Sequence, residues 1–321
     1  MYTKIYGTGS YVPDKVLTNQ DLMKFVDTND EWIFSRTGIK ERRIVTDQST
    51  LDLAEQASLK AIESSGIDKH KIDLLIVATV TSDYAFPGVA NLLQARLKLD
   101  NITAFDINAA CSGFIYAMQI ADKMIKSSAF KYALIVGAEV LSRLTDWRDR
   151  NTCVLFGDGA GAMVIGKSKE NKIKDIITGS KGDEDMLLYS KNPELKNPEI
   201  NAISQQDHIH MKGTEVFKFA SRIMPKTIKK LLERNNLTTE DINYIVAHQA
   251  NLRIIDKSAR ELEIDMDKMF VNIDRYGNTS AASVAIAIDE AIRNNLIKRK
   301  DLFMTVAFGG GLTWAGALIE Y

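Results

Sequence analysis

The sequence predicts an α/β fold in which a mainly parallel sheet is covered by helices and the same α/β unit occurs twice. Three observations lead to this expectation. Short β-branched runs alternate with helical patterns along the chain, which is typical of a covered parallel sheet. Segments of the two halves resemble one another at nearly equal offsets. The composition, with 45% hydrophobic and 26% charged residues, is that of a globular protein with an ample core.

The expected strands are short apolar runs rich in β-branched residues. They cover residues 74–81, 104–107, 132–137, 154–156, 162–165, 244–247, 269–273 and 303–307. Among the helices between them, the clearest begins after Ser49, with Asp52 three residues further on, and ends at Gly66. Serine followed by an acidic residue at that spacing is typical of a helix N-terminus, and glycine is typical of a C-terminus.

Three pairs of segments support the duplication. They are DLLIVATV with DINYIVAH, DINAACSGF with NIDRYGNTSAA, and ALIVGAE with FMTVAFGG. Their offsets are all about 170 residues and they occur in the same order, which indicates two copies of one unit. The second pair places Cys111 opposite Thr279. We expect the first half to cover residues 1–170 and the second half to cover residues 171–321.

Charge and cysteine content exclude several classes of protein. The 41 basic and 42 acidic side chains create no global field that would recruit nucleic acid or a membrane surface. No apolar run approaches the roughly 20 residues that span a bilayer, and the first residues lack the apolar stretch of a signal peptide. Two cysteines do not form a disulfide scaffold. We therefore expect a cytoplasmic protein.

Cys111 is the first candidate for chemistry. It lies between an expected strand and an apolar helix over residues 112–125, and the positive end of a helix favours a nucleophilic thiolate. The small residues around it leave room for a substrate. The alternative is a small buried residue, which is the commonest fate of a free cysteine. For Cys153, within the expected strand segment NTCVLFGDG and with no helix after it, a core position is expected.

Two polar residues follow strands of the second half. His248 comes directly after the strand 244–247 in YIVAHQAN, and chemistry in α/β folds is placed at the carboxyl ends of strands. Asn278, in GNTSAAS, lies at the turn that the duplication places opposite Cys111. Asparagine there is more often a helix cap than a catalyst. Together, cysteine, histidine and asparagine indicate acyl transfer through a thioester.

Two glycine runs stand at other strand ends. FGGGLTWAG, residues 308–316, has backbone N–H groups suited to an oxyanion hole. FGDGAG, residues 156–161, is its counterpart in the first half. Neither run matches a phosphate loop, because the lysine with serine or threonine that such a loop requires is missing.

These motifs, taken together, resemble those of β-ketoacyl-acyl carrier protein synthase III. The resemblance rests on AACSGF, HQAN, GNTSAAS and AFGGGLTWAGAL, and also on TGSYVPDKVLTN, DTNDEWIFSRTGIKER and FGDGAGAMV, so it spans nearly the whole chain. It implies the thiolase-like fold, with two duplicated halves in a layered α-β-α-β-α arrangement. It also implies a homodimer that starts fatty acid synthesis.

The resemblance further implies the catalytic roles. Cys111 would attack an acyl-CoA, commonly acetyl-CoA, while its own N–H and that of Gly310 hold the oxyanion. Malonyl-acyl carrier protein would then lose CO₂, and His248 and Asn278 would stabilise the enolate. The carbanion would attack acyl-Cys111 to give the β-ketoacyl product. Neither a metal nor another cofactor is expected, because paired donors in a dry pocket carry the charge.

Substrate-binding positions are implied in the same way. The residues expected to contact CoA or the acyl group are Thr28, Trp32, Arg36, Arg150 and Phe217, with Phe86 closing the acyl pocket from the partner subunit. The residues expected to dock the acidic carrier protein are Lys218, Arg253, Lys257 and Arg260. The last three share one helix face, so a plain solvated face is the alternative. This chain departs from the family's consecutive basic pair, because Glu261 follows Arg260.

Several other functions share parts of this pattern. A hydroxymethylglutaryl-CoA synthase or a degradative thiolase would share the fold, but such thiolases use a second cysteine late in the chain, and Cys153 is the last one here. A ketosynthase III-like enzyme of a specialised secondary-metabolite pathway can keep the same motifs with another acceptor. A papain-like peptidase also has cysteine, histidine and asparagine in this order, but in a CGSCW-type context. A non-catalytic partner subunit would be expected to lack the nucleophile.

Overall fold

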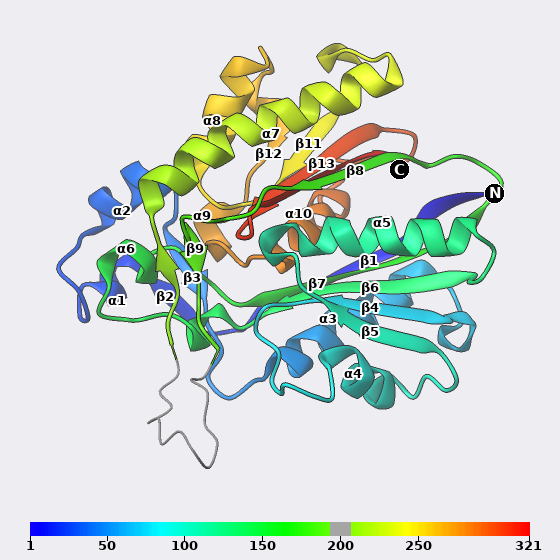
Figure 1. The fold of residues 1–321 in the computed structure, drawn as a ribbon, viewed down its shortest axis with the longest axis horizontal. Helices are drawn as coiled ribbons and strands as arrows, with labels where there is room; N and C mark the ends of the chain where they lie inside the picture. The colour runs from blue at the N-terminus through cyan, green and yellow to red at the C-terminus, as the bar shows by residue number, and fades with distance from the viewer. Residues whose placement is uncertain (193–206) are drawn as a thin grey trace.

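The structure is a computed structural model that describes residues 1–192 and 207–321. Two five-stranded sheets dominate its described part (Figure 1). From edge to edge, the first sheet contains β1 (Tyr2–Tyr11), β7 (Gly159–Ser168), β6 (Tyr132–Glu139), β4 (Leu74–Ala78) and β5 (Thr103–Ile107). The second contains β8 (Ile173–Ser180), β14 (Thr313–Glu320), β13 (Leu302–Gly309), β11 (Tyr244–Ala247) and β12 (Met269–Phe270).

The second sheet repeats the first strand for strand. In the first, β1, β7 and β6 pair antiparallel, and β6, β4 and β5 pair parallel. In the second, β8, β14 and β13 pair antiparallel, and β13, β11 and β12 pair parallel. The predicted duplicated α/β fold is therefore confirmed, although each sheet is mixed rather than mainly parallel.

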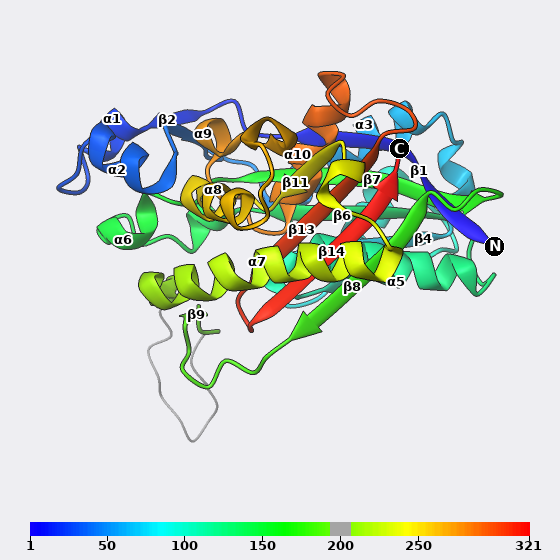
Figure 2. The same ribbon diagram turned by 90° about the horizontal axis from the view of Figure 1, so that it is seen from above.

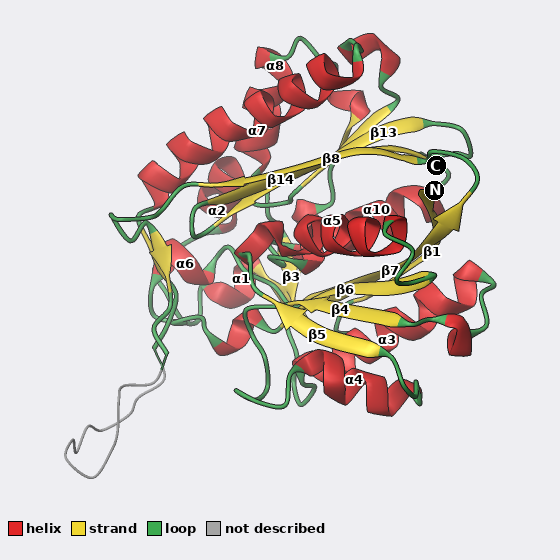
Figure 3. Ribbon diagram, turned by 45° about the vertical axis from the view of Figure 1, so that its right-hand side comes forward, coloured by secondary structure: helices red, strands yellow, loops and turns green. Residues whose placement is uncertain are grey.

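Helices complete five layers (Figures 1 and 3). The outer face of the first sheet is covered by α3 (Thr50–Ser65) and α4 (Val89–Leu97), and that of the second by α7 (Gly213–Asn235) and α8 (Leu252–Glu261). Two helices, α5 (Gly113–Lys126) and α10 (Ala282–Arg293), lie between the sheets. Their apolar side chains share one core with residues of both sheets. Because the two halves share this core, they cannot fold as separate units without exposing it.

Short elements gather mostly at one end of the sheets, where Figure 2 shows α1, α2, α6, α8 and α9 together. The remaining helices and strands are α1 (Asn19–Leu22), α2 (Asp30–Thr37), α6 (Arg150–Cys153), α9 (Ile273–Tyr276), β2 (Val16–Thr18), β3 (Glu41–Arg43), β9 (Leu188–Tyr189) and β10 (His210–Met211). Single 3₁₀ turns are η1 (Lys69–Lys71), η2 (Ala110–Ser112), η3 (Leu141–Arg143), η4 (Thr239–Asp241) and η5 (Met266–Lys268). The two termini lie at the opposite end (Figure 2).

Local signals set several helix ends as expected. Ser49 and Asp52 form a capping box at the start of α3, and Gly66 ends this helix with a left-handed φ of 63°. The predicted helix after Cys111 is also present, since α5 begins at Gly113 and its N-terminus follows the turn η2.

Other expectations need correction. The expected strand 154–156 is wrong: α6 ends at Cys153, and Phe156 makes only an isolated bridge to Asn278. Cys153 is buried as expected, but in a helix. Its apolar neighbours pack against a small core around Ile33, and a short apolar run does not distinguish a strand from a buried helix turn. The strands β1, β8 and β14 were not anticipated, since glycine, threonine and lysine interrupt their apolar pattern.

The turns before α5 and α10 correct the register of the duplication. Asn108 accepts a hydrogen bond from the N–H of Ala110 at 3.1 Å, and Asn278 accepts one from the N–H of Ser280 at 2.8 Å. Ala110 and Ser280 both have positive φ, 46° and 47°. The equivalent residue of Cys111 is therefore Ala281 and not Thr279.

Candidate active site

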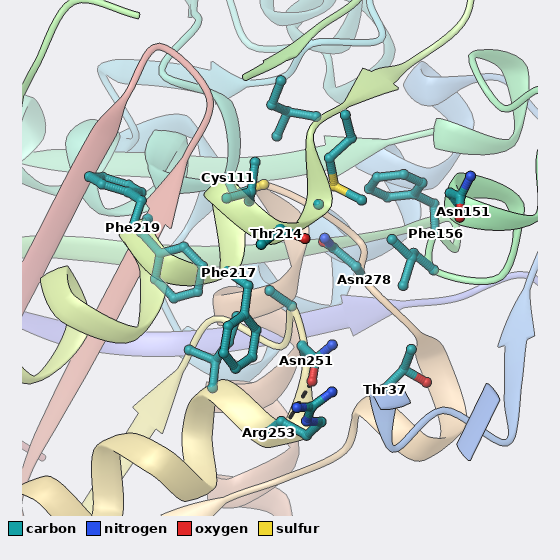
Figure 4. Close-up of a pocket in the computed structure, with 18 of the residues that line it drawn as sticks. Thr37, Cys111, Asn151, Phe156, Thr214, Phe217, Phe219, Asn251, Arg253 and Asn278 are labelled. Carbon is teal, nitrogen blue, oxygen red and sulfur yellow. Dashed lines mark hydrogen bonds between the residues drawn. The ribbon is translucent and has the colours of Figure 1, made fainter. Parts of the chain in front are cut away.

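A cavity of about 690 Å³ opens between the two halves and is lined by Cys111, His248 and Asn278. The sequence places these residues far apart, and the fold brings them together. Figure 4 shows Cys111, Asn278 and Phe156 on one side of the cavity, while Arg253 and Thr37 lie on the side remote from Cys111. The cavity therefore extends from the basic side chain of Arg253 to the thiol of Cys111.

Cys111 is held in a strained turn. Ala110 before it has the left-handed φ of 46° that residues with a Cβ rarely adopt. Thr313 of β14 supports the turn, because its hydroxyl donates to the carbonyl of Ala109 at 2.9 Å. The side chain of Cys111 is 8% exposed, so only a small part faces the cavity. Such strain is kept where a side chain must be presented in one direction.

Burial keeps the Cys111 thiol protonated. It raises the pKa of Cys111 from its ordinary value of 9.0 to about 12, and the hydroxyl of Ser280 counteracts part of that rise. The N-terminus of a helix stabilises a negative charge by up to about 2 kcal/mol, which offsets roughly half of the rise. The helix position alone, on which the sequence expectation rested, therefore does not produce a thiolate at neutral pH.

His248 follows β11 and is buried. Its backbone N–H donates to the carbonyl of Val306 at 2.8 Å. Its ring packs edge-on against Phe308, with 5.4 Å between the ring centroids. Burial lowers the pKa of His248 to about 3, so the imidazole is neutral. Within the described part of the chain, its Nδ1 has no hydrogen-bond partner. A neutral imidazole has one N–H to donate and one nitrogen to accept.

Asn278 is fixed by its backbone and by its own carboxamide. Its N–H donates to Leu155 at 2.8 Å, and its carbonyl accepts from Gly157 at 3.0 Å. Because its Oδ1 accepts the N–H of Ser280, the Nδ2 amide remains the donor for the cavity. The turn therefore orients the amide. The capping alternative is wrong, because α10 begins at Ala282 with Ala281 at its N-cap and no side-chain cap.

The glycine run packs closely against the nucleophile. A Cβ on Gly309 would lie 2.6 Å from the backbone nitrogen of Cys111, so only glycine fits there. Gly310, which the sequence indicated, lines the cavity together with Gly309. The role of Gly309 as a spacer was missed, and only its place in the run GGG signalled it.

The expected CoA residues lie mainly at the cavity mouth. Trp32 and Arg36 line it, and the guanidinium groups of Arg36 and Arg150 each lie 4.7 Å from the centroid of the Trp32 ring. Thr28 and Arg150 are not in the lining, but Arg150 donates to the carbonyl of Asp27 at 2.9 Å. The three-residue cluster of Trp32, Arg36 and Arg150 offers an aromatic face and two cations to a phosphorylated ligand.

Phe86 does not line this cavity and is 86% exposed. It lies in the loop between β4 and α4, whereas Phe217 lines the cavity from α7. Any role of Phe86 in closing an acyl pocket therefore requires a second copy of the chain.

The expected docking residues differ in how free their charges are. Arg253 and Lys257 lie 5.3 Å and 6.0 Å from the centroid of the Phe217 ring. Lys218 forms an ion pair with Glu215 at 2.8 Å, and Arg260 forms one with Asp256 at 2.5 Å. Arg253 and Lys218 both line the cavity, and because the charge of Lys218 is paired with Glu215, Arg253 is the cation best placed at the mouth.

Neither a metal site nor a membrane span is found among the described residues. The described part of the chain contains no group of three or more histidine, cysteine or acidic side chains that could hold a metal ion. Among the described helices, none has both the length and the apolar composition required to cross a bilayer.

Comparison with known proteins identifies the family. Residues 105–182 match the family model of 3-oxoacyl-[acyl-carrier-protein] synthase III, and residues 232–321 match the model of its C-terminal part. The β-ketoacyl-[acyl-carrier-protein] synthase III of Clostridium acetobutylicum is 49% identical over 99% of this chain and 98% of its own.

Solved structures agree with this match. The 3-oxoacyl-[acyl-carrier-protein] synthase III of Aquifex aeolicus VF5 is 47% identical, with a TM-score of 0.93 over 99% of this chain and 100% of its own. The priming β-ketosynthase of the R1128 polyketide pathway is 33% identical, with a TM-score of 0.92 over 99% of this chain and 96% of its own. On these matches and on its duplicated thiolase-like fold, the chain belongs to the β-ketoacyl-acyl carrier protein synthase III family of condensing enzymes.

Proposed function

We propose that the protein condenses a short acyl-CoA, acetyl-CoA in the first instance, with malonyl-acyl carrier protein. The products are a β-ketoacyl-acyl carrier protein, CoA and CO₂, and the reaction starts fatty acid synthesis. The observation that carries the proposal is one cavity between the two halves that Cys111, His248 and Asn278 line together. The 49% identity to a β-ketoacyl-[acyl-carrier-protein] synthase III supports it.

In the first half-reaction, the sulfur of Cys111 attacks the acyl carbonyl and CoA leaves. The oxyanion is held by the N–H groups of Cys111 and Gly310. Preorganised donors of this kind act strongly because they need no reorganisation when the charge develops. The adenine of CoA stacks on Trp32, and Arg36 and Arg150 bind its phosphates, with Thr28 and Phe217 as further contacts.

In the second half-reaction, malonyl-acyl carrier protein loses CO₂. His248, which its burial keeps neutral, and the Nδ2 amide of Asn278 donate hydrogen bonds to the thioester oxygen of the enolate. The nucleophilic carbon of the enolate attacks the acyl carbonyl carbon on Cys111, and the Cys111 sulfur leaves. Loss of CO₂ supplies the carbanion without a strong base, so we propose that the reaction requires no metal or other cofactor.

The partners follow from the same roles. We propose that the acidic carrier protein docks on Arg253 and Lys257, with smaller contributions from Lys218 and Arg260, whose charges are paired. We propose a homodimer in which the partner's Phe86 closes the acyl pocket, since this side chain is 86% exposed in the single chain.

The substrates are cytoplasmic molecules, and we place the protein in that compartment. The domain division remains a proposal at residues 170 and 171, in the segment that joins β7 to β8.

A panel of acyl-CoAs tests the function. The protein is mixed with malonyl-acyl carrier protein and acyl-CoAs of increasing length, and the products are identified by mass. We expect β-ketoacyl-acyl carrier protein from acetyl-CoA, with CO₂ released in equal amount. Product only with another acceptor would instead assign the chain to a specialised pathway, the alternative represented by the 33% identical priming β-ketosynthase.

A further inference from the structure

Gln249 directly follows His248 in the HQAN motif, and the roles proposed above do not use it. Its side chain is buried, with 1% exposed. The cavity is lined by His248 and Ala250 on either side of it, but not by Gln249 itself. The side chain of Gln249 therefore does not touch a substrate, and any part that it has in the reaction acts through the residues that it holds.

The carboxamide of Gln249 makes every hydrogen bond that it can. Its Nε2 donates to the carbonyl of Ala247 at 2.8 Å and to that of Phe270 at 3.1 Å. Its Oε1 accepts the N–H of Asn272 at 2.9 Å and that of Ile273 at 3.1 Å. A carboxamide has two N–H groups to donate and two lone pairs to accept. The two carbonyls and two N–H groups around it are therefore matched by an amide.

Gln249 holds the peptide groups on both sides of His248. The peptide group before His248 has its carbonyl, that of Ala247, bound to Gln249 Nε2, and its N–H is bound to the carbonyl of Val306 at 2.8 Å. The peptide group after His248 contains the N–H of Gln249, which donates to the hydroxyl of Ser283 at 2.8 Å. Because a peptide group is planar, these two planes fix the direction in which the His248 side chain leaves the backbone.

The other partners of Gln249 lie on the segment that contains Asn278. Asn272 is the N-cap of α9 and Ile273 is its first residue, and α9 ends two residues before Asn278. Ser283, which accepts the N–H of Gln249, belongs to α10 on the other side of Asn278. Gln249 is therefore bound to this segment both before and after Asn278, and it joins the segment to the end of β11.

We propose that Gln249 is a positioning residue for decarboxylation. Through its carboxamide and its backbone N–H, it sets the imidazole of His248 and the amide of Asn278 at the spacing at which both reach one enolate oxygen. The inference deepens the proposed function and rests on the enolate role given there to these two donors. Gln249 touches no substrate, so it acts only through the placement of His248 relative to Asn278.

The two half-reactions should depend on Gln249 to different degrees. Decarboxylation uses both donors at once, and each must lie within about 2.7–3.2 Å of the same oxygen. A misplacement of about 1 Å can cost roughly 10²-fold in rate. Acylation of Cys111 instead uses the N–H groups of Cys111 and Gly310, and the hydrogen bonds of Gln249 given above involve neither residue. Loss of Gln249 should therefore slow decarboxylation and spare acylation.

Gln249→Met tests the proposal, because methionine is unbranched, of similar length and uncharged, but makes none of these hydrogen bonds. The release of CO₂ from malonyl-acyl carrier protein and the labelling of Cys111 by acetyl-CoA are measured on the same preparation. We expect CO₂ release to fall roughly 10–10²-fold while labelling stays within about threefold of wild type. Unfolded protein lowers both rates by the same factor, so the ratio of the two rates isolates positioning. An equal loss in both rates, or normal CO₂ release, overturns the proposal.

Gln119→Met is the matched control. The carboxamide of Gln119, in α5, is also hydrogen-bonded on both sides: its Nε2 donates to the carbonyl of Ile176 at 3.3 Å, and its Oε1 accepts the hydroxyl of Thr178 at 2.8 Å. Gln119 is outside the cavity lining. The ratio of CO₂ release to labelling should therefore stay at its wild-type value. A fall in this ratio as large as that of Gln249→Met would overturn the assignment, because the loss of any bonded amide would then have the same effect.

Ser283→Ala keeps the test decisive if Gln249→Met does not fold. It leaves the carboxamide in place and removes only the acceptor of the Gln249 N–H. The ratio of CO₂ release to labelling should fall about fivefold, the size of one hydrogen bond, and an unchanged ratio contradicts the proposal. Wild-type protein that releases no CO₂ from malonyl-acyl carrier protein would instead contradict the proposed function itself.

Discussion

The turn at residues 108–113 and the turn at residues 278–283 have the same backbone design and different chemistry. In each, an asparagine accepts the N–H two residues on, and that next residue has a left-handed φ, 46° in one and 47° in the other. The first turn is followed by the thiol of Cys111. The second buries its asparagine in the cavity, whereas Asn108 is exposed. The two turns of the duplicated fold therefore have equivalent backbones, and they differ in the side chains that they place at the cavity.

The two halves also differ in what they offer at the cavity mouth. The first half contributes Trp32 with Arg36 and Arg150, and the second contributes Arg253 and Lys257 around Phe217. An aromatic ring between guanidinium groups suits a nucleotide, whereas an exposed basic helix face suits an acidic protein. This division predicts that each half can be impaired for one substrate at a time.

The largest expected effect comes from the nucleophile. Cys111→Ala should abolish labelling by acetyl-CoA, because no other side chain at that turn can form a thioester. Intact and peptide mass spectrometry measure the label. Cys153→Ala is the matched control, since Cys153 is also buried but belongs to α6, outside the cavity lining. Labelling of Cys153 in wild-type protein would contradict the assignment.

The two asparagines test the comparison directly. Asn278→Ala removes both the turn hydrogen bond and the amide donor, so malonyl decarboxylation should fall roughly 10²–10³-fold, as for a lost oxyanion donor. Asn108→Ala removes only the corresponding turn bond and should change decarboxylation by less than about tenfold. Rates are measured as CO₂ release by folded variants. Equal losses would mean that Asn278 acts only as a turn residue.

Charge reversal separates the substrates of the two halves. Arg253→Glu should raise the KM for malonyl-acyl carrier protein roughly tenfold and spare labelling by acetyl-CoA, with the effect shrinking at high salt because exposed charges are screened. Arg260→Glu should have a smaller effect, since Asp256 already pairs with Arg260 at 2.5 Å. If Arg253→Glu has a normal KM for malonyl-acyl carrier protein at low salt, this face of α8 does not dock the carrier and is only exposed to solvent.

The smallest expected effect concerns stability alone. Ser49 caps α3 in a capping box, whereas the start of α7, the outer helix of the second half, has Lys212 with no side-chain cap. Ser49→Ala should lower the free energy of unfolding by about 1 kcal/mol, and Lys212→Ala should lower it less, since it removes no cap and only an exposed hydrogen bond from Lys212 Nζ to the carbonyl of Asp185. Denaturant titration measures both. An unchanged stability of Ser49→Ala would show that packing of α3 on the first sheet, not its cap, fixes the helix start.

Local and repeated patterns explain what could be predicted. The duplicated α/β fold, the helix after Ser49 and the three residues Cys111, His248 and Asn278 were accessible because each lies at a strand end or in a recurring motif. The expected strand 154–156 failed because three apolar residues look alike in a strand and in a buried turn. The register of the duplication was wrong by two residues, since side-chain identity at the two turns has diverged while the backbone has not.

The sequence by itself determined the fold class and the family, because these depend on residue order and on short motifs. Tertiary structure decided the ionisation of the site, because desolvation depends on which atoms surround a group in space. Only the folded chain shows that the Cys111 thiol is buried and protonated and that His248 is neutral.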